Sequence, residues 1–442
     1  MRVFCLCTAI VLTLLTYEVN AKPASAQEHK GADEPALMSG FPPPPEQLVT
    51  RANFMLPPYN RWAFQHMREL QPTREVARGN GPISPLDSFT LDLDQISVTA
   101  SDKRELGLEQ FLETSYTDSF LILHGGKVIY ERYMNNMVPE RQHQMFSATK
   151  SFVGVLVLMF IENGAISSDQ LVSHYLPELA GSAFGDATVQ QVLDMTTGIS
   201  FSEIYDDPDS EIWRYGYVFN VFPRPEQGYT GPVVIYDYLP TLNKQGAHGE
   251  WFHYVTPNTD VLAWIISRIS GKSLAQLLEF YLWEPMGVEQ TAYIWLDDSG
   301  TEMAGGGLNV TARDAARFGQ MILQGGKLNN RQIISSAIAE TILSPGDPAG
   351  FTRHYGDDPW YGQVASAYRN QWWTFNNPHK AVSAIGVHGQ YIYIDKKAGM
   401  VVVKQSSAPD AEGGANLIND VEGPLLYQAI AEHLMKHNTV HD

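Results

Sequence analysis

The chain has 442 residues, 44% of them hydrophobic, and a formal net charge of −19. A chain of this length can bury a large core without disulfides, and its composition is ordinary for a folded soluble protein. A surface this acidic repels phosphate backbones, which argues against a nucleic-acid partner.

Residues 1–26 have the layout of a secretory signal peptide. Arg2 gives a positive start, the run 3–17 is apolar apart from Thr and Cys, and small residues follow up to Ala21 and Ala26. An apolar run of about 15 residues is short for a bilayer span. We therefore expect cleavage after Ala21 or Ala26, with export to the periplasm or the medium. The alternative is an uncleaved membrane anchor.

Both cysteines of the chain, Cys5 and Cys7, lie inside this segment. Without it the protein has no disulfide, no thiol nucleophile and no thiolate metal site. No other stretch is long and apolar enough to span a membrane. We expect no metal and no cofactor, and the sequence leaves the oligomeric state open.

Residues 27–90 are rich in proline and polar residues, including four prolines at 42–45. This composition predicts an extended lead-in that wraps a domain at 91–438 rather than an independent unit. The lead-in also carries Phe54 and Trp62, so parts of it are expected to dock.

Strand patterns lie near both ends of the chain, and helical patterns lie between them. Runs rich in β-branched and aromatic residues predict a hairpin and two strands, at 119–133, 391–394 and 400–404. Helices are expected at 147–162, 188–195, 257–270, 273–283, 311–324, 331–343 and 422–436. The pattern predicts an α+β fold, in which an antiparallel sheet from both chain ends is flanked by helices. A mostly helical lobe is inserted at about 165–380.

Ser147 and Lys150 stand at the start of an apolar helix. A spacing of three places them on one helical face. A serine hydroxyl becomes a nucleophile when a base takes its proton, and a lysine whose charged form is disfavoured can be that base. The helix N-terminus adds N–H groups suited to an oxyanion. By itself S-x-x-K arises by chance about once or twice in such a chain, and the alternative is a serine N-cap beside a solvated lysine.

Two further segments support a catalytic interpretation. Tyr254 lies in a polar loop before the helix at 257–270, where it could complete a proton relay with Lys150 as phenol or phenolate. The glycine-rich segment 386–390 leads into a strand, where a substrate can approach closely and a backbone N–H can face it. The alternatives are a packed aromatic and an ordinary β-turn. The sequence contains no G-x-S-x-G nucleophile elbow, no H-E-x-x-H zinc-protease motif, no Walker loop and no dinucleotide-binding fingerprint.

In this order, Ser147-x-x-Lys150, Tyr254 and His388-Gly389 resemble the three motifs of the serine hydrolases related to class C β-lactamases and penicillin-binding proteins. The resemblance extends over about residues 110–436, with further matching segments at 162–179, 192–198 and 306–319. It implies a β-lactamase/transpeptidase-like fold and an acyl-enzyme on Ser147.

The same resemblance implies roles for the residues around the third motif. The N–H groups of Ser147 and Gln390 would form the oxyanion hole. His388 would bind the substrate or support the strand that follows it, and Gly389 would allow the substrate to approach that strand closely.

Within that family the chain is most similar to the 6-aminohexanoate-dimer hydrolases and related esterases. The similarity rests on Ser-Ala-Thr-Lys itself, on the lead-in 59–70 and on the segment 205–210. It implies that Tyr205 holds an amide substrate; the alternative is a solvated loop tyrosine.

The chain also departs from the β-lactamase pattern. Thr256 stands where those enzymes have Asn, and Val387-His388 stand where they have Lys-Thr. Loss of that lysine removes a carboxylate-binding cation. We therefore expect hydrolysis of carboxylic esters or short linear amides. The alternatives are β-lactamase or D-Ala-D-Ala carboxypeptidase activity, and an inactive binding protein with this fold.

Four aromatic residues are candidates for the walls of the substrate cleft, and core packing is their alternative role. They are Trp213, Tyr217, Trp372 and Trp373.

Overall fold

The computed structural model describes residues 36–225, 228–356 and 358–437, so the expected signal peptide lies outside the described residues. An antiparallel sheet of seven strands forms the centre, in the order β11-β12-β13-β14-β15-β4-β5. Its strands come from both ends of the chain, which confirms the expected α+β fold. They are β4 (Thr117–His124), β5 (Lys127–Tyr133), β11 (Ala365–Arg369), β12 (Trp372–Phe375), β13 (Val382–Gly386), β14 (Gln390–Asp395) and β15 (Met400–Ser406).

The predicted hairpin is the pair β4 and β5. Gly125 and Gly126 join the strands with φ of 57° and 84°, the conformation of a tight type I′ turn that glycine adopts without strain. The outer edge of β5 is covered by the lead-in. The amides of Phe89 and Leu91 donate to the carbonyl oxygens of Val128 and Ile129, both at 2.8 Å. This pairing shields the edge strand from other chains.

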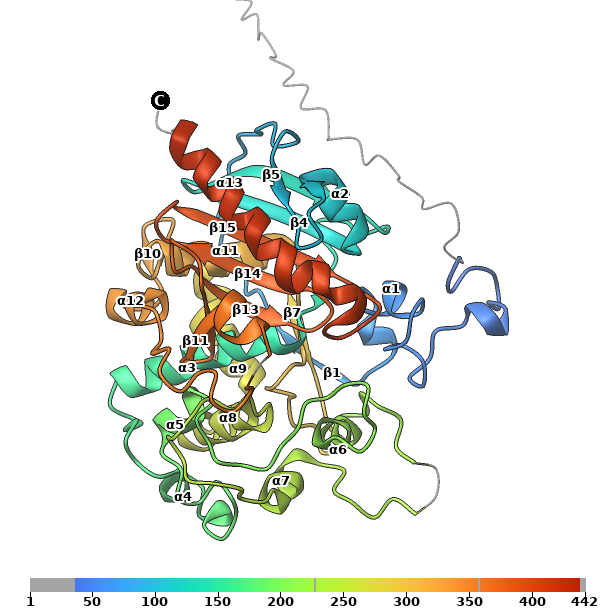
Figure 1. Cartoon of the computed structure of the whole chain (residues 1–442). Coiled ribbons are helices and arrows are strands. Elements are labelled where there is room, and N and C mark those ends of the chain that lie inside the picture. The colour runs from blue at the N-terminus through green and yellow to red at the C-terminus, as the bar shows by residue number, and fades with distance from the viewer. Residues whose placement is uncertain (1–35, 226–227, 357, 438–442) are drawn as a thin grey trace, which may run out of the picture.

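Helices cover both faces of the sheet because its strands alternate between two apolar faces. Phe120 and Ile122 pack in one core cluster with α2 (Leu108–Thr114) and α13 (Gly423–His437). Leu121 and Leu123 face the other cluster, with α3 (Thr149–Glu162) and α11 (Ala312–Leu323). Figure 1 shows α13 lying across one face of the sheet, with the helical lobe below.

Most of the predicted helices are present. The expected helix at 257–270 is α8, Pro257–Ser270, which ends at Gly271 with φ of 68°. The expected helix at 331–343 is shorter, because β10 (Arg331–Gln332) precedes it. That helix is α12 (Ser336–Leu343), and the expected helices at 188–195 and 273–283 contain α5 (Val189–Leu193) and α9 (Leu274–Leu278). Helices that the sequence did not predict are α1 (Asn60–Ala63), α4 (Val172–Tyr175), α6 (Glu211–Val218), α7 (Ile235–Tyr238) and α10 (Glu284–Met286). No helix within the described ranges has the length and apolar character needed to cross a bilayer.

The helical lobe is less extensive than the 165–380 expected. β11 and β12 fall inside that range but belong to the central sheet. The aromatic run that contains Trp372 and Trp373 is a sheet strand, which its β-forming residues favour. A second sheet, in the order β1-β7-β8-β6, joins the lead-in to the lobe. The remaining strands are β1 (Thr73–Val76), β2 (Ser97–Thr99), β3 (Glu105–Gly107), β6 (His143–Gln144), β7 (Ala292–Trp295), β8 (Leu308–Val310) and β9 (Lys327–Leu328).

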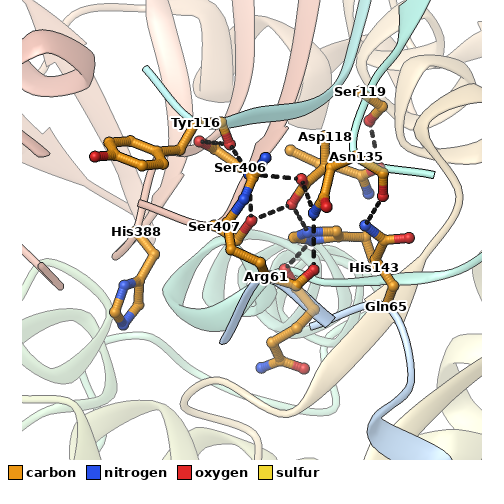
Figure 2. Close-up of polar contacts among 12 residues, drawn as sticks. Arg61, Gln65, Tyr116, Asp118, Ser119, Asn135, His143, His388, Ser406 and Ser407 are labelled. Carbon is orange, nitrogen blue, oxygen red and sulfur yellow. Dashed lines mark hydrogen bonds and ion pairs between the residues drawn. The ribbon is translucent and has the colours of Figure 1, made fainter. Parts of the chain in front are cut away.

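A buried carboxylate ties the lead-in to the sheet. Asp118 on β4 accepts hydrogen bonds from Arg61 (3.0 Å) and His143 (2.9 Å). It also accepts from Asn135 (2.7 Å) and Ser407 (2.6 Å), as Figure 2 shows. Burial alone would raise the pKa of Asp118, but Arg61 and these hydrogen bonds hold it below its usual range. The described part of the lead-in is therefore docked on the domain through polar contacts as well as aromatic ones.

We expect the substitution Asp118→Ala to lower the free energy of unfolding by about 3–5 kcal/mol, because it leaves buried donors without their acceptor. Denaturant unfolding followed by tryptophan fluorescence measures the change. Asp102→Ala removes an exposed partner of Arg104 and is the control, with a nearly unchanged midpoint. Equal midpoints for the two variants would contradict this role of Asp118.

Candidate active site

Ser147 lies on a tight turn, Phe146–Ala148, which leads directly into α3. Phe146 has φ of 44°, a left-handed conformation that costs free energy for a residue with a side chain. The Phe146 ring packs against Phe64 (4.8 Å between centroids) and His388 (5.3 Å). Packing from the lead-in and from the segment after β13 thus supports the strained turn that carries Ser147.

Lys150 meets Ser147 as its spacing on one helical face predicts. Its Nζ lies 2.8 Å from the Ser147 Oγ and donates to the Gly305 carbonyl oxygen at 2.6 Å. Burial lowers the pKa of Lys150 to about 8, and the negative charges of Glu203 and Asp260 limit that fall. About a tenth of the side chain is then a free amine at pH 7. The arrangement gives Ser147 a general base within hydrogen-bond distance.

Tyr254 lies beside this pair. Lys150 Nζ is 5.1 Å from the Tyr254 ring centroid, and Ser147 is close enough to affect the pKa of the Tyr254 hydroxyl. The ring stacks on Trp373 at 5.4 Å, which fixes its orientation. Burial and the charge of Glu203 raise the pKa of Tyr254 well above its ordinary value. Of the two forms that the sequence left open, the structure therefore favours the neutral phenol.

Asp260 places the carbonyl group that holds Lys150. Its Oδ1 accepts from the amides of Ala304 (3.0 Å) and Gly305 (3.3 Å), and its Oδ2 accepts from the Tyr215 hydroxyl (2.8 Å). A Cβ on Gly305 would lie 2.4 Å from the Tyr215 hydroxyl oxygen, so the close approach requires glycine. Burial raises the pKa of Asp260 to about 7 against the opposing effects of Tyr215 and Lys150.

Glu203 connects the two tyrosine-bearing segments. One carboxylate oxygen accepts from the Thr256 amide (2.7 Å), and the other from the Thr256 hydroxyl (3.0 Å). The Tyr205 hydroxyl also points to Glu203, at 3.4 Å. Burial raises the pKa of Glu203, while Lys150 and Thr256 oppose the shift. Thr256, which stands where the β-lactamases have Asn, thus anchors the loop of Tyr254.

A narrow cavity with a volume of about 40 Å³ opens beside Ser147. Its walls include Met55 from the lead-in, Tyr205 and Val387. Tyr205, which the resemblance implies holds an amide substrate, is in the wall of this cavity, and that role stays a prediction. Among the described residues that line the cavity, none carries a charge, and neither Lys150 nor Tyr254 is one of them.

The three other predicted binding residues are not brought to the cavity. The His388 ring is buried, with Nδ1 2.7 Å from the Ala408 carbonyl oxygen, and burial lowers its pKa to about 4. The Gln390 side chain donates to a carbonyl oxygen at the end of β15. Positive φ angles at His388 (62°) and Gly389 (89°) bend the chain at this point. Val387 is the residue of this segment that lines the cavity. The roles of His388, Gly389 and the Gln390 N–H stay predictions.

None of the four aromatic residues proposed as cleft walls lines the cavity. Trp373 supports Tyr254, and Trp213 stacks on the cavity residue Phe222 at 4.1 Å. Trp372 packs on Phe318, and Tyr217 packs on Tyr229.

Sequence reasoning missed Glu203, Asp260 and Gly305. Asp260 carries a signal, since it is an acid directly before the apolar run 261–266 of α8, and a buried acid needs hydrogen-bond partners. Gly305 precedes a glycine pair that the family resemblance includes. Glu203 lies in a polar loop with no pattern that distinguishes it.

Comparison with known proteins finds a matching family model, a similar sequence and a similar solved structure. The family model described as Beta-lactamase matches residues 109–422. The 6-aminohexanoate-dimer hydrolase of Paenarthrobacter ureafaciens is 37% identical over 360 residues, covering 80% of this chain and 87% of the relative. A solved Bacillus anthracis structure named for the same hydrolases has a TM-score of 0.79 at 33% identity, covering 89% of this chain and 99% of that one.

A more distant structure shares the fold alone. EstCE1, a hydrolase with promiscuous acyltransferase activity, has a TM-score of 0.56 at 16% identity and covers 73% of this chain and 96% of its own.

The carboxylate of Glu203 favours the ammonium form of Lys150, so its neutralisation should favour the free amine. We expect Glu203→Gln to shift the rise of Ser147 reactivity with pH from about 8 to lower pH. The reaction at pH 7 would become about two- to fivefold faster. The rate of fluorophosphonate labelling between pH 6 and 10 measures this shift.

Glutamine can retain both bonds to Thr256, which isolates the effect of charge. Asp206→Asn, on the exposed part of the same loop, is the matched control and should leave the profile in place. A Glu203→Gln profile that coincides with the wild type, or that moves to higher pH, would refute this electrostatic role.

Proposed function

Because the chain belongs to the β-lactamase family of serine hydrolases, we propose that it hydrolyses carboxylic esters and short linear amides through an acyl-enzyme on Ser147. The observation that carries this proposal is the 2.8 Å contact between the Ser147 hydroxyl and the buried amine of Lys150. The similarity to a 6-aminohexanoate-dimer hydrolase supports linear amides as one substrate class.

The proton follows a short path in this proposal. The free amine of Lys150 takes the proton of Ser147 as its oxygen attacks the carbonyl carbon. The neutral phenol of Tyr254 gives its proton to the leaving group and regains one from the Lys150 ammonium. Water then attacks the acyl-enzyme, with the same two groups accepting and returning the proton. The acid is released and Ser147 is restored.

The oxyanion of the tetrahedral intermediate needs donors that are fixed before the reaction. We assign this role to the N–H of Ser147, at the start of α3, and to the N–H of Val387. Support comes from the position of both residues in the wall of the same cavity.

Efficient β-lactam turnover is a weaker candidate. Penicillins and D-Ala-D-Ala peptides carry a carboxylate, which is usually recognised by a cation. Val387 stands where the β-lactamases have that lysine, and the described lining of the cavity carries no charge. The site therefore favours substrates that are neutral near the scissile bond.

The pattern of residues 1–26 supports one further proposal, that the enzyme acts after export, in the periplasm or the medium.

We expect a fluorophosphonate to label one residue of the wild type, Ser147, and to leave Ser147→Ala unlabelled, as intact and peptide mass spectra would show. The wild type should hydrolyse p-nitrophenyl butyrate clearly and a chromogenic cephalosporin little, with the 6-aminohexanoate dimer as the amide substrate.

Two outcomes would contradict the proposal. Absent labelling, or equal labelling of Ser147→Ala, would favour an inactive binding protein with this fold. Faster turnover of the cephalosporin than of the ester would overturn the substrate assignment.

A further inference from the structure

A second hollow lies at the far end of the strand that leads to Val387. It has a volume of about 360 Å³ and is lined by residues from the end of α12, the segment before β13 and the turn after β14. Val382, the first residue of β13, lies in its wall, whereas Val387 follows β13 and lies in the wall of the cavity beside Ser147. Five residues of extended chain separate these positions by about 16 Å. The hollow is therefore distinct from the active site.

The lining of this hollow carries positive charge on a chain that is strongly acidic. Lys380, Lys396 and Lys397 line it together with His379, and no acid is among its described lining residues. The chain as a whole has 49 acidic side chains against 30 lysines and arginines. Three lysines in a wall of eight residues therefore reverse the charge balance of the rest of the protein. We call this hollow the lysine pocket.

Two of its three ammonium groups have no carboxylate partner in the described part of the chain. Lys380 donates to the side-chain oxygen of Asn376, a neutral acceptor, at 3.0 Å. Lys397 has neither a hydrogen bond nor an ion pair within the ranges that the structure describes. Lys396, by contrast, is paired with Glu340 on α12 at 2.6 Å. The pocket thus offers a ligand two positive charges that no carboxylate neutralises.

A buried carboxylate holds the polar part of the wall in place. Nδ1 of His379 lies 2.6 Å from Oδ2 of Asp395, and the two side chains are 4% and 0% exposed. Oδ1 of Asp395 accepts from the amide of Ala398 at 2.9 Å, which fixes the turn that carries Lys396 and Lys397. Groups that are positioned before a ligand arrives lose less entropy when it binds.

The rest of the wall is apolar. Leu343, Val382 and Ile394 are buried core residues, and Pro345 completes the lining. Small-molecule sites typically combine such apolar walls with a few convergent polar groups. A ligand with both hydrocarbon and an anionic end gains from the apolar wall and from the lysines, whereas an inorganic anion gains only from the lysines.

We propose that the lysine pocket binds a small amphiphilic carboxylate of the medium-chain fatty acid class. Its carboxylate pairs with Lys380 and Lys397, and its hydrocarbon lies against the apolar wall. Binding requires no reaction at Ser147, so the proposal stands independently of the hydrolase activity.

Isothermal titration calorimetry with octanoate at low ionic strength tests the role of the charges. We expect the double variant Lys380→Gln, Lys397→Gln to bind octanoate about fivefold more weakly or worse, since each ion pair is at the surface. The double variant Lys272→Gln, Lys327→Gln removes the same charge from exposed positions elsewhere and should keep the wild-type Kd.

Matched ligands separate charge from hydrocarbon. Octanamide, which is neutral, should bind about fivefold more weakly than octanoate. Acetate, which lacks the chain, should bind at least about tenfold more weakly. The bromine of 8-bromooctanoate soaked into crystals should appear in the lysine pocket by its anomalous scattering.

Three outcomes would overturn the proposal. Equal Kd values for the two double variants would show that Lys380 and Lys397 do not bind the acid. Inorganic phosphate that binds as tightly as octanoate would show a general anion site without selection for hydrocarbon. Bromine found only in the cavity beside Ser147 would place the acid in the active site instead.

Discussion

The amine of Lys150 and the hydroxyl of Ser147 meet at 2.8 Å, and the other buried polar groups of the site are arranged around this contact. An amine can accept a proton near neutral pH only where its charged form is disfavoured, and burial in the core provides that condition. Burial in turn requires a partner for the N–H groups, and the Gly305 carbonyl oxygen supplies it. The fold positions that carbonyl through Asp260, a residue that touches neither the nucleophile nor the base.

The electrostatics of the site are a balance of opposing effects. Desolvation moves the pKa of Lys150 down, and two acids, Glu203 and Asp260, limit the fall to about 8. The same desolvation keeps Tyr254 neutral. In the proposed mechanism, one buried environment therefore supplies a base and an acid side by side, which acyl transfer to water requires. Glu203 also holds the Tyr254 loop in place through Thr256. One side chain therefore affects both the position of Tyr254 and the pKa of Lys150.

The features that could be predicted from the sequence are those that a local pattern of residues determines. The β4–β5 hairpin, α8 and the pairing of Ser147 with Lys150 follow from turn glycines, apolar periodicity and a spacing of three. The missed features depend on long-range geometry. β12 pairs with β11 and β13 in the central sheet, although its aromatic residues were expected at the cleft. The place of Val387 in the cavity wall was also missed, because the two positive φ angles that follow it, at His388 and Gly389, are not revealed by motif matching.

The central claim is that Lys150 acts as the base, and the pH dependence of ester hydrolysis by Lys150→Ala tests it most directly. The wild-type kcat/KM should rise through a pH of about 8. Lys150→Ala should lose at least about a hundredfold in rate and lose that rise, with partial recovery in added ethylamine in proportion to its free base. A Lys150→Ala enzyme that keeps the wild-type rate and the same rise near pH 8 would contradict the account.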